Sequence, residues 1–184
     1  MAANRLIRAG GWTAVMAAVL LAGCAPKKAP PPPPPPPVPV RPAPPPAVAL
    51  DPESYMAFAA SNALFAVQAS RLAEGRGSTN KIKKFATKVV IDHTGIGAQL
   101  SFAGRYIDLL PSSRLLPEHQ AMLERLATSS DFDGTYKAQM AKVLREAAYA
   151  HRAFEASGDS PTLRPVASFA APVCEKNLEA LRKL

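Results

Sequence analysis

The 184-residue sequence predicts an all-α fold, an antiparallel bundle of four long helices plus a short one within residues 51–184. Apolar residues recur there at intervals of three, four and seven, the spacing that places them on one face of a helix. No segment alternates apolar and polar residues for long enough to form a convincing strand. Capping residues, prolines and glycines mark where the helices begin and end.

The first two helices begin at recognisable caps. Asp51-Pro52 indicates an N-cap followed by proline at the first helical position, and we expect this helix to stop at Gly75. Ser78 or Thr79 caps the second, long helix. The apolar positions of the two helices are Met56, Phe58, Leu64, Phe65, Leu72, Ile82, Phe85, Val89, Ile96, Leu100, Phe102 and Ile107.

Three glycines interrupt the second helix. Gly95, Gly97 and Gly104 each weaken its helix propensity by about 1 kcal/mol relative to alanine. We therefore expect close helix packing or a bend at these positions.

Two helices follow the connection from Pro111 to Pro117. The first is short and runs from Glu118 to Thr128. The second begins at Ser130 or Asp131 and stops at Gly158. Their apolar positions are Met122, Leu123, Leu126, Phe132, Tyr136, Met140, Val143 and Leu144.

The last helix is predicted to start at Ser160-Pro161. Pro165 and Pro172 then kink or interrupt it, because each proline lacks the backbone N–H of an intrahelical hydrogen bond. The apolar positions are Leu163, Val166, Phe169, Val173, Leu178 and Leu181.

The N-terminal segment has the layout of a secretory signal peptide, residues 1–23. Arg5 and Arg8 precede an apolar run from Trp12 to Leu21 that is too short for a good transmembrane helix. Leu-Ala-Gly then leads directly into Cys24 and resembles the lipobox of bacterial lipoproteins. The resemblance implies cleavage before Cys24 and acylation of its sulfur. The alternative is an ordinary secretory signal with a coincidental cysteine.

Acylated Cys24 would attach the protein to a membrane. Each buried methylene contributes roughly 0.8 kcal/mol, so two or three acyl chains such as palmitate hold firmly where one binds reversibly. Ala25 follows where an inner-membrane retention signal typically has aspartate. The resemblance therefore implies the outer membrane, with the protein on the periplasmic face.

Residues 24–50 are predicted to form a disordered, proline-rich stalk. Proline dominates from Pro26 to Pro46, with an unbroken run from Pro30 to Pro37. Such a segment adopts extended polyproline II, and some twenty residues reach on the order of 60 Å. We interpret it as a spacer. The alternative is a ligand for a proline-recognition groove or the cell wall.

Charge and cysteine content exclude some functions. The net charge is +8, but Arg5, Arg8, Lys27, Lys28 and Arg41 precede residue 51, so the helical part is only mildly basic. Its basic residues are interleaved with acidic ones, unlike the clustered basic face of a nucleic-acid-binding protein. We expect no nucleic-acid partner.

Cys174 has no intrachain partner if Cys24 is acylated. We interpret it as a small buried residue, with a redox thiol or an intermolecular bridge as the alternative.

The second predicted helix contains Val89-Val90-Ile91-Asp92-His93-Thr94, followed by Leu100. This stretch is similar to the Asp-His-Thr helix of the ferritin-like domain-of-unknown-function family 4142, often labelled outer membrane proteins, and the helical part as a whole resembles that family. The resemblance extends from about Ser54 to the C-terminus. Further landmarks are Phe65 to Ala73, Glu118-His119-Gln120, Phe132-Asp133, Tyr136, Met140, Leu163, Phe169-Ala170 and Pro172.

Ferritin-like bundles hold two metal ions through glutamates and Glu-x-x-His pairs on facing helices. The resemblance places the expected ligands at Ala66, with Gln68 two residues on, at Leu144 and at Asn177, none of which is a strong metal ligand. Asp92 and His93 remain as weak, vestigial candidates, with Glu146 and Glu175 as partial substitutes. Adjacent helical residues point about 100° apart, so Asp92 and His93 cannot form a site alone.

The histidines have simple interpretations. His93 is either an inward-facing polar residue satisfied by hydrogen bonding or a vestigial ligand. His119 is predicted to be a surface residue, and His151 to form a solvated pair with Glu155. The sequence has no His-Glu-x-x-His, paired-cysteine or P-loop motif, and no Ser/His/Asp nucleophile arrangement can be picked out.

The sequence thus favours a lipid-anchored envelope protein with a non-enzymatic helical bundle on a polyproline stalk, in a binding or structural role. Its expected partners are the membrane, through Cys24, and an envelope protein or the cell wall. No catalytic residue or cofactor is expected. The alternative is a ferritin-like metal-binding or oxidoreductase domain with a degenerate site, based on Asp92 and His93.

Overall fold

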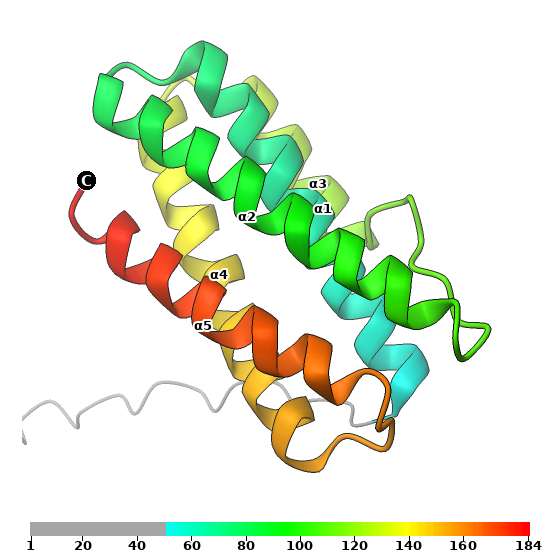
Figure 1. Cartoon of the computed structure of the whole chain (residues 1–184). Helices are drawn as coiled ribbons and strands as arrows, with labels where there is room; N and C mark the ends of the chain where they lie inside the picture. The colour runs from blue at the N-terminus through cyan, green and yellow to red at the C-terminus, as the bar shows by residue number, and fades with distance from the viewer. Residues whose placement is uncertain (1–50) are drawn as a thin grey trace, which may run out of the picture. The chain divides into compact units, whose positions relative to one another are not determined.

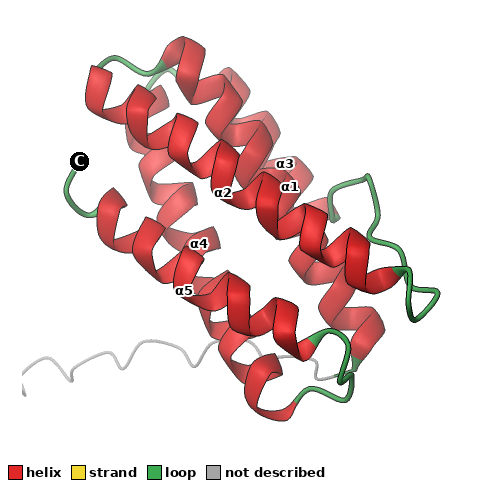
Figure 2. Ribbon diagram, viewed as in Figure 1, coloured by secondary structure: helices red, strands yellow, loops and turns green. Residues whose placement is uncertain are grey.

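The computed structural model describes residues 51–184, and in this part of the chain every regular element is a helix (Figures 1 and 2). The predicted signal peptide, Cys24 and the proline-rich segment lie outside the described residues. The prediction of four long helices and one short helix is confirmed. The helices are α1 (Pro52–Arg76), α2 (Asn80–Gly104), α3 (Pro117–Thr128), α4 (Phe132–Ser157) and α5 (Arg164–Leu181).

Neighbouring long helices run antiparallel. Short turns connect α1 to α2 and α4 to α5, and Figure 1 shows α2 and α5 in front, with α1, α3 and α4 behind them. Tyr55 at the start of α1 hydrogen bonds His151 near the end of α4. Lys88 in the first half of α2 donates to Asn177 in the second half of α5. These contacts fix α1 against α4 and α2 against α5.

Side-chain caps start three of the helices. Asp51, Thr79 and Asp131 each accept a hydrogen bond from a backbone N–H three residues later. The structure thus selects Thr79 over Ser78 and Asp131 over Ser130. Each cap satisfies a backbone donor that has no partner within its helix.

The helix α1 ends at Arg76, beyond the predicted stop at Gly75. Gly75 is within the helix, where the space for a side chain is open, and α1 continues to Arg76. Gly77 caps it, and its N–H donates to the Ala73 carbonyl oxygen at 2.9 Å. A Cβ at Gly77 would lie only 2.7 Å from that oxygen, so the close packing that favours glycine occurs at Gly77 and not at Gly75.

The start of α5 also differs from the prediction. Ser160 to Leu163 form a turn, and α5 begins at Arg164, so Pro165 lies in the first turn. A proline there loses no intrahelical hydrogen bond, because the first N–H groups of a helix have no partner within it. Pro165 therefore does not interrupt the helix, and α5 also continues through Pro172.

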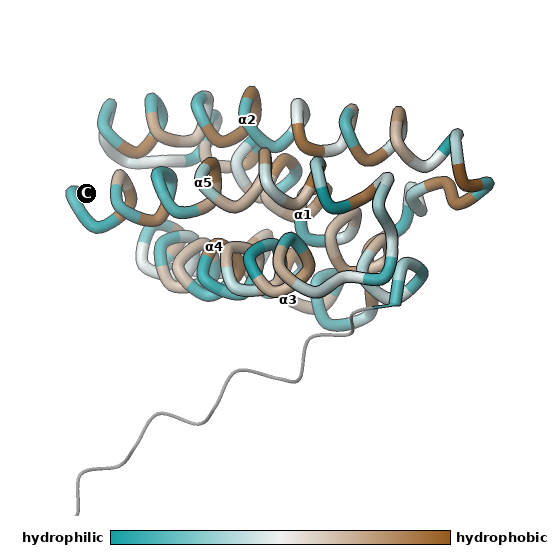
Figure 3. Tube along the Cα trace, turned by 60° about the horizontal axis from the view of Figure 1, so that its bottom comes forward, coloured by the Kyte–Doolittle hydropathy of each residue, from teal (hydrophilic) through white to brown (hydrophobic). Residues whose placement is uncertain are grey.

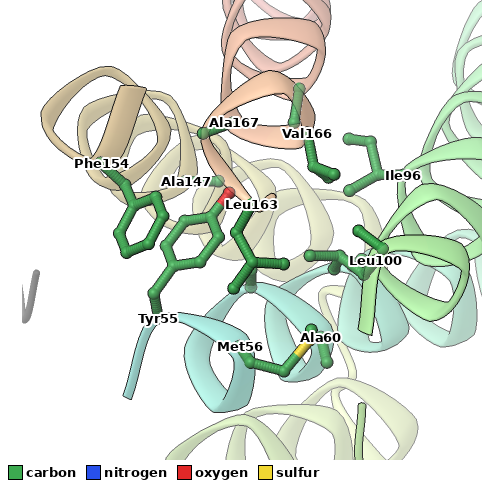
Figure 4. Packing of buried hydrophobic residues seen from close by; sticks show 14 of the residues in the cluster. Tyr55, Met56, Ala60, Ile96, Leu100, Ala147, Phe154, Leu163, Val166 and Ala167 are labelled. Atoms are coloured by element: carbon green, nitrogen blue, oxygen red, sulfur yellow. The ribbon is translucent and has the colours of Figure 1, made fainter. Parts of the chain in front are cut away.

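The interior consists of two hydrophobic clusters, one towards each end of the bundle. In the first, the rings of Tyr55 and Phe154 stack with centroids 3.7 Å apart beside Leu163 (Figure 4). The second surrounds Phe65 and Tyr136. Burying each large apolar side chain contributes roughly 1.5–3 kcal/mol, so these clusters are the main source of stability.

Two aromatic residues predicted to face the core are exposed. Phe102 is 58% exposed and Phe169 is 46% exposed, whereas Leu100 and Ala170 beside them are buried. Successive positions on a helix differ by about 100°, so a helix that turns Leu100 inward turns Phe102 outward.

Only one of the three glycines predicted to allow close packing does so within residues 51–184. A Cβ at Gly104 would lie 2.2 Å from the Leu109 carbonyl oxygen and 3.2 Å from the methyl group of Met56. At Gly95 and Gly97 a Cβ would meet no atom within 4 Å.

In the described part of the chain, no helix is both long and apolar enough to span a bilayer.

Candidate functional site

The sequence candidates Asp92 and His93 lie in the middle of α2 and point to different surroundings. His93 is 1% exposed and faces the interior. Asp92 lies at the surface, where its carboxylate binds the Lys88 ammonium group. The structure therefore does not bring the two side chains together into one site, as their adjacent positions on a helix predicted.

Three buried polar side chains lie near the point where their helices pass from one hydrophobic cluster to the other. On α2, His93 falls between Val89 of the second cluster and Ile96 of the first. Asn62 of α1 and Asn177 of α5 lie at the corresponding boundaries of their helices. We call Asn62, His93 and Asn177 the central polar layer.

The central polar layer is only partly hydrogen bonded. The Asn62 amide donates to the Val143 carbonyl oxygen at 3.1 Å. Asn177 accepts from the Lys88 ammonium group at 2.9 Å, but its own amide nitrogen has no partner. Neither ring nitrogen of His93 has a hydrogen-bond partner within the described residues. Unpaired buried polar groups of this kind cost about 1–3 kcal/mol each.

Burial keeps the two central histidines uncharged. It lowers the pKa of His93 to about 4, opposed by the Asp92 carboxylate and assisted by the Lys88 cation. Burial also lowers the pKa of His151 to about 3, and His93 lies close enough to lower it further. Both rings are therefore neutral at pH 7, and neither can act there as a proton donor of ordinary acidity.

The predictions for His119 and His151 are wrong, because both side chains are buried. His119 Nδ1 lies 2.7 Å from Ser61 Oγ, and its ring stacks on Phe65 with centroids 5.5 Å apart. His151 Nδ1 lies 2.9 Å from Tyr55 Oη, and no ion pair with Glu155 forms. Glu155 instead pairs with an arginine, Arg152.

The sequence did carry a signal for this burial. Met122 and Leu126 follow His119 by three and seven residues, and Ala147 and Phe154 flank His151 at four and three residues. All four neighbours face the core. Helical spacing from them predicts an inward direction for both histidines.

Cys174 is buried, as predicted. Burial raises the pKa of its thiol to about 12, with smaller contributions from the carboxylates of Glu175 and Asp92. The thiolate is the reactive form of cysteine, so this sulfur is inert as a nucleophile at neutral pH.

The residues present do not fit a ferritin-type metal centre. At the positions where the resemblance places ligands, Ala66 and Leu144 are fully buried parts of the second hydrophobic cluster. The substitutes Glu146 and Glu175 form ion pairs with Lys142 and Arg152. Throughout residues 51–184, no three His, Cys, Asp or Glu side chains converge closely enough to share a metal ion. We therefore derive no reaction step through a metal.

Comparison with known proteins identifies one family. The family model described as Domain of unknown function (DUF4142) matches residues 38–184. The searches of curated proteins and of solved structures found no match. The match begins before the first described helix and includes all five helices.

Proposed function

The chain belongs to the DUF4142 family, and because that family has no assigned activity, we propose its function from its own residues. The protein is a lipid-anchored envelope protein whose helical bundle binds a partner or supports the envelope without catalysing a reaction. The burial and protonation of His93, His151 and Cys174 support a bundle that does not catalyse a reaction. The sequence around Cys24 supports the lipid anchor.

The central groups lack the features of a catalytic site. His93 and His151 are neutral and sealed inside the bundle, and the Cys174 thiol is protonated at neutral pH. The carboxylate nearest to His93 in sequence, Asp92, lies outside and binds Lys88. General acid–base or nucleophilic catalysis needs a group of suitable pKa within reach of a substrate. His93, His151 and Cys174 do not meet both conditions.

The anchor follows from the segment before the helices. Leu21-Ala22-Gly23-Cys24 comes after a basic and apolar stretch, which is the order of a lipoprotein signal. An acylated Cys24 needs no membrane-spanning helix, since the buried acyl chains supply the free energy of attachment. Ala25 supports the outer membrane as the destination.

The proline-rich stalk would hold the bundle away from the bilayer. Residues 24–50 separate the proposed anchor from Asp51, the cap of α1. An extended chain of this composition reaches on the order of 60 Å. The bundle could then contact components of the envelope beyond the lipid headgroups.

The anchor is tested by fractionating cells that produce the Cys24→Ser variant. We expect the variant to lose acylation and leave the membrane fraction. Cys174→Ala is the matched control, since it removes the other cysteine and should leave the protein membrane-bound. A Cys24→Ser variant that stays in the membrane fraction would contradict the anchor.

The binding role is tested by chemical crosslinking in intact cells, followed by mass spectrometry of the adducts. We expect a crosslinked adduct with another envelope component. Recovery of only this chain, as monomer or as self-adduct, would contradict a role in binding such a partner.

A metal-binding function is the second candidate, favoured by the two unpartnered nitrogens of His93. Its weakness is the donor set, since Ala66 and Leu144 replace the expected ligands. Elemental analysis of the intact chain, purified without chelator, decides between the candidates. Stoichiometric metal that disappears in His93→Ala would support this candidate, whereas a folded, metal-free protein would eliminate it.

A further inference from the structure

The outward face of α2 carries an apolar strip that no part of the described chain covers. Ile91 is 67% exposed and Phe102 is 58% exposed. Gly95 and Ala98 lie between them, so the four positions are spaced by four, three and four residues. That spacing aligns them along one side of a helix, and Figure 3 shows hydrophobic residues recurring along α2. We call these four residues the α2 strip.

Gly95 has no function inside the described chain. It lies within α2, where glycine costs about 1 kcal/mol relative to alanine. A Cβ there would meet nothing within 4 Å, so no neighbouring helix requires its absence. A missing side chain on an outward face allows another backbone to approach closely. Gly97 has equally open space, so it is the position of Gly95 on the α2 strip that suits it to a contact with another molecule.

We propose that the α2 strip is the interface of a homodimer, in which α2 packs antiparallel against α2 of a second copy. The strip is self-complementary about its own midpoint. In that arrangement Ile91 faces Phe102 of the second copy, and Gly95 faces Ala98 of the second copy. A two-fold dimer requires this property, because the same patch must serve both partners.

The exposed apolar surface is sufficient for the centre of such an interface. Tyr106 is 71% exposed, and its ring packs edge-on to Phe102 with centroids 5.2 Å apart, which extends the strip at one end. Large side chains at these exposures present on the order of 400 Å² in each copy. A stable interface buries roughly 800 Å² per partner, so the apolar residues would supply about half of it and the polar rim the rest.

The rim of the proposed interface is polar. Thr94 and Gln99 are exposed on either side of the α2 strip and face each other across the two-fold axis. Lys88 would lie opposite Arg105 of the second copy, a pair of like charges that Asp92, already bound to Lys88, offsets only in part. Exposed charge pairs contribute little, so the apolar centre supplies the affinity.

Cysteine crosslinking of the intact chain tests the geometry. Ala98 lies within half a helical turn of the two-fold axis, so Ala98→Cys should form a disulfide-linked dimer on mild oxidation. Ala138→Cys, an exposed position on α4, is the matched control and should stay monomeric. Cys174 is buried, and the unmodified chain gives the background. Absence of the Ala98→Cys dimer would overturn the proposal, as would its crosslinking to a different polypeptide.

Two glycine substitutions in the intact chain test whether Gly95 allows the two α2 helices to approach each other closely. Gly95 and Gly97 lie two residues apart in α2, both with open space around them, but only Gly95 belongs to the α2 strip. Gly95→Ala should weaken dimerisation about tenfold, because overpacking a tight contact has a cost of about that size. Gly97→Ala should leave it unchanged. Light scattering of the detergent-solubilised chain measures both; a monomeric parent protein, or equal effects of the two substitutions, would overturn the proposal.

Discussion

Replacing His93 with leucine should make the fold less sensitive to acid. In the folded protein the His93 ring is buried, unpartnered and neutral, and burial lowers its pKa to about 4. In the unfolded chain the same ring has an ordinary pKa of about 6.5. Its contribution to stability is therefore complete above about pH 6.5 and is lost as the pH falls towards 4, because only the unfolded chain then takes up the proton.

The size of the effect follows from the difference between these two pKa values. Each pH unit between them costs about 1.4 kcal/mol of unfolding free energy, so His93 accounts for a loss of about 2 kcal/mol between about pH 7.5 and about pH 5. His93→Leu removes that loss. At about pH 7.5 the variant should be as stable as the parent or more stable, by about 1–3 kcal/mol, because two unpaired buried nitrogens are gone.

Urea unfolding of both proteins at the two pH values measures the difference. Thr94→Ala is the matched control, since it changes the neighbouring exposed, uncharged residue and retains the buried ring. The reasoning is refuted if His93→Leu loses as much stability as the parent between the two pH values. It is also refuted if the variant is destabilised by more than about 2 kcal/mol at about pH 7.5, since His93 would then have partners.

Four further substitutions test the fold. Tyr55→Phe removes the hydrogen bond to His151 and should lower the unfolding free energy by about 1 kcal/mol, measured by urea unfolding; an unchanged value would show that the bond contributes nothing. Gly75→Ala should raise the melting temperature, since its space is open, whereas Gly77→Ala should lower it through the clash with the carbonyl oxygen of α1; the reverse order would contradict the assigned helix end. Asp51→Ala removes the cap of α1 and should cost about 1 kcal/mol, with reduced amide-exchange protection of the first turn as the local readout; unchanged protection would contradict it.

The helices were predictable because their signals are local. Asp51, Thr79 and Asp131 cap their own helices, and the apolar spacing between caps reports helical faces. The split between Asp92 outside and His93 inside was also predictable, because it depends only on helical geometry. These features need no knowledge of which helix lies beside which.

The features that the sequence did not predict are those that depend on contacts between residues far apart in the chain. Gly75 and Gly77 are equivalent by propensity, and only the tight packing at Gly77 shows where α1 ends. The inward direction of His119 could be read from its helical spacing, but its partners Ser61 and Phe65 could not, because the sequence does not show that α3 packs against α1. His151 depends in the same way on Tyr55, which lies 96 residues away in the chain.

The sequence predicted which residue types occupy the candidate site better than it predicted how they are arranged. The poor metal ligands at Ala66, Leu144 and Asn177 could be read from the sequence once the resemblance aligned them. The central polar layer could not be predicted, because the boundary between the two clusters is known only once the helices are packed. Its unpaired nitrogens are a property of packing in three dimensions.

The mass of the mature chain, extracted from membranes, tests the central claim of a lipid-anchored bundle most directly. The account predicts a polypeptide that begins at Cys24, with a mass increased by a diacylglyceryl group and lost in Cys24→Ser. A mature chain that begins elsewhere, or that carries Cys24 without lipid, would contradict it.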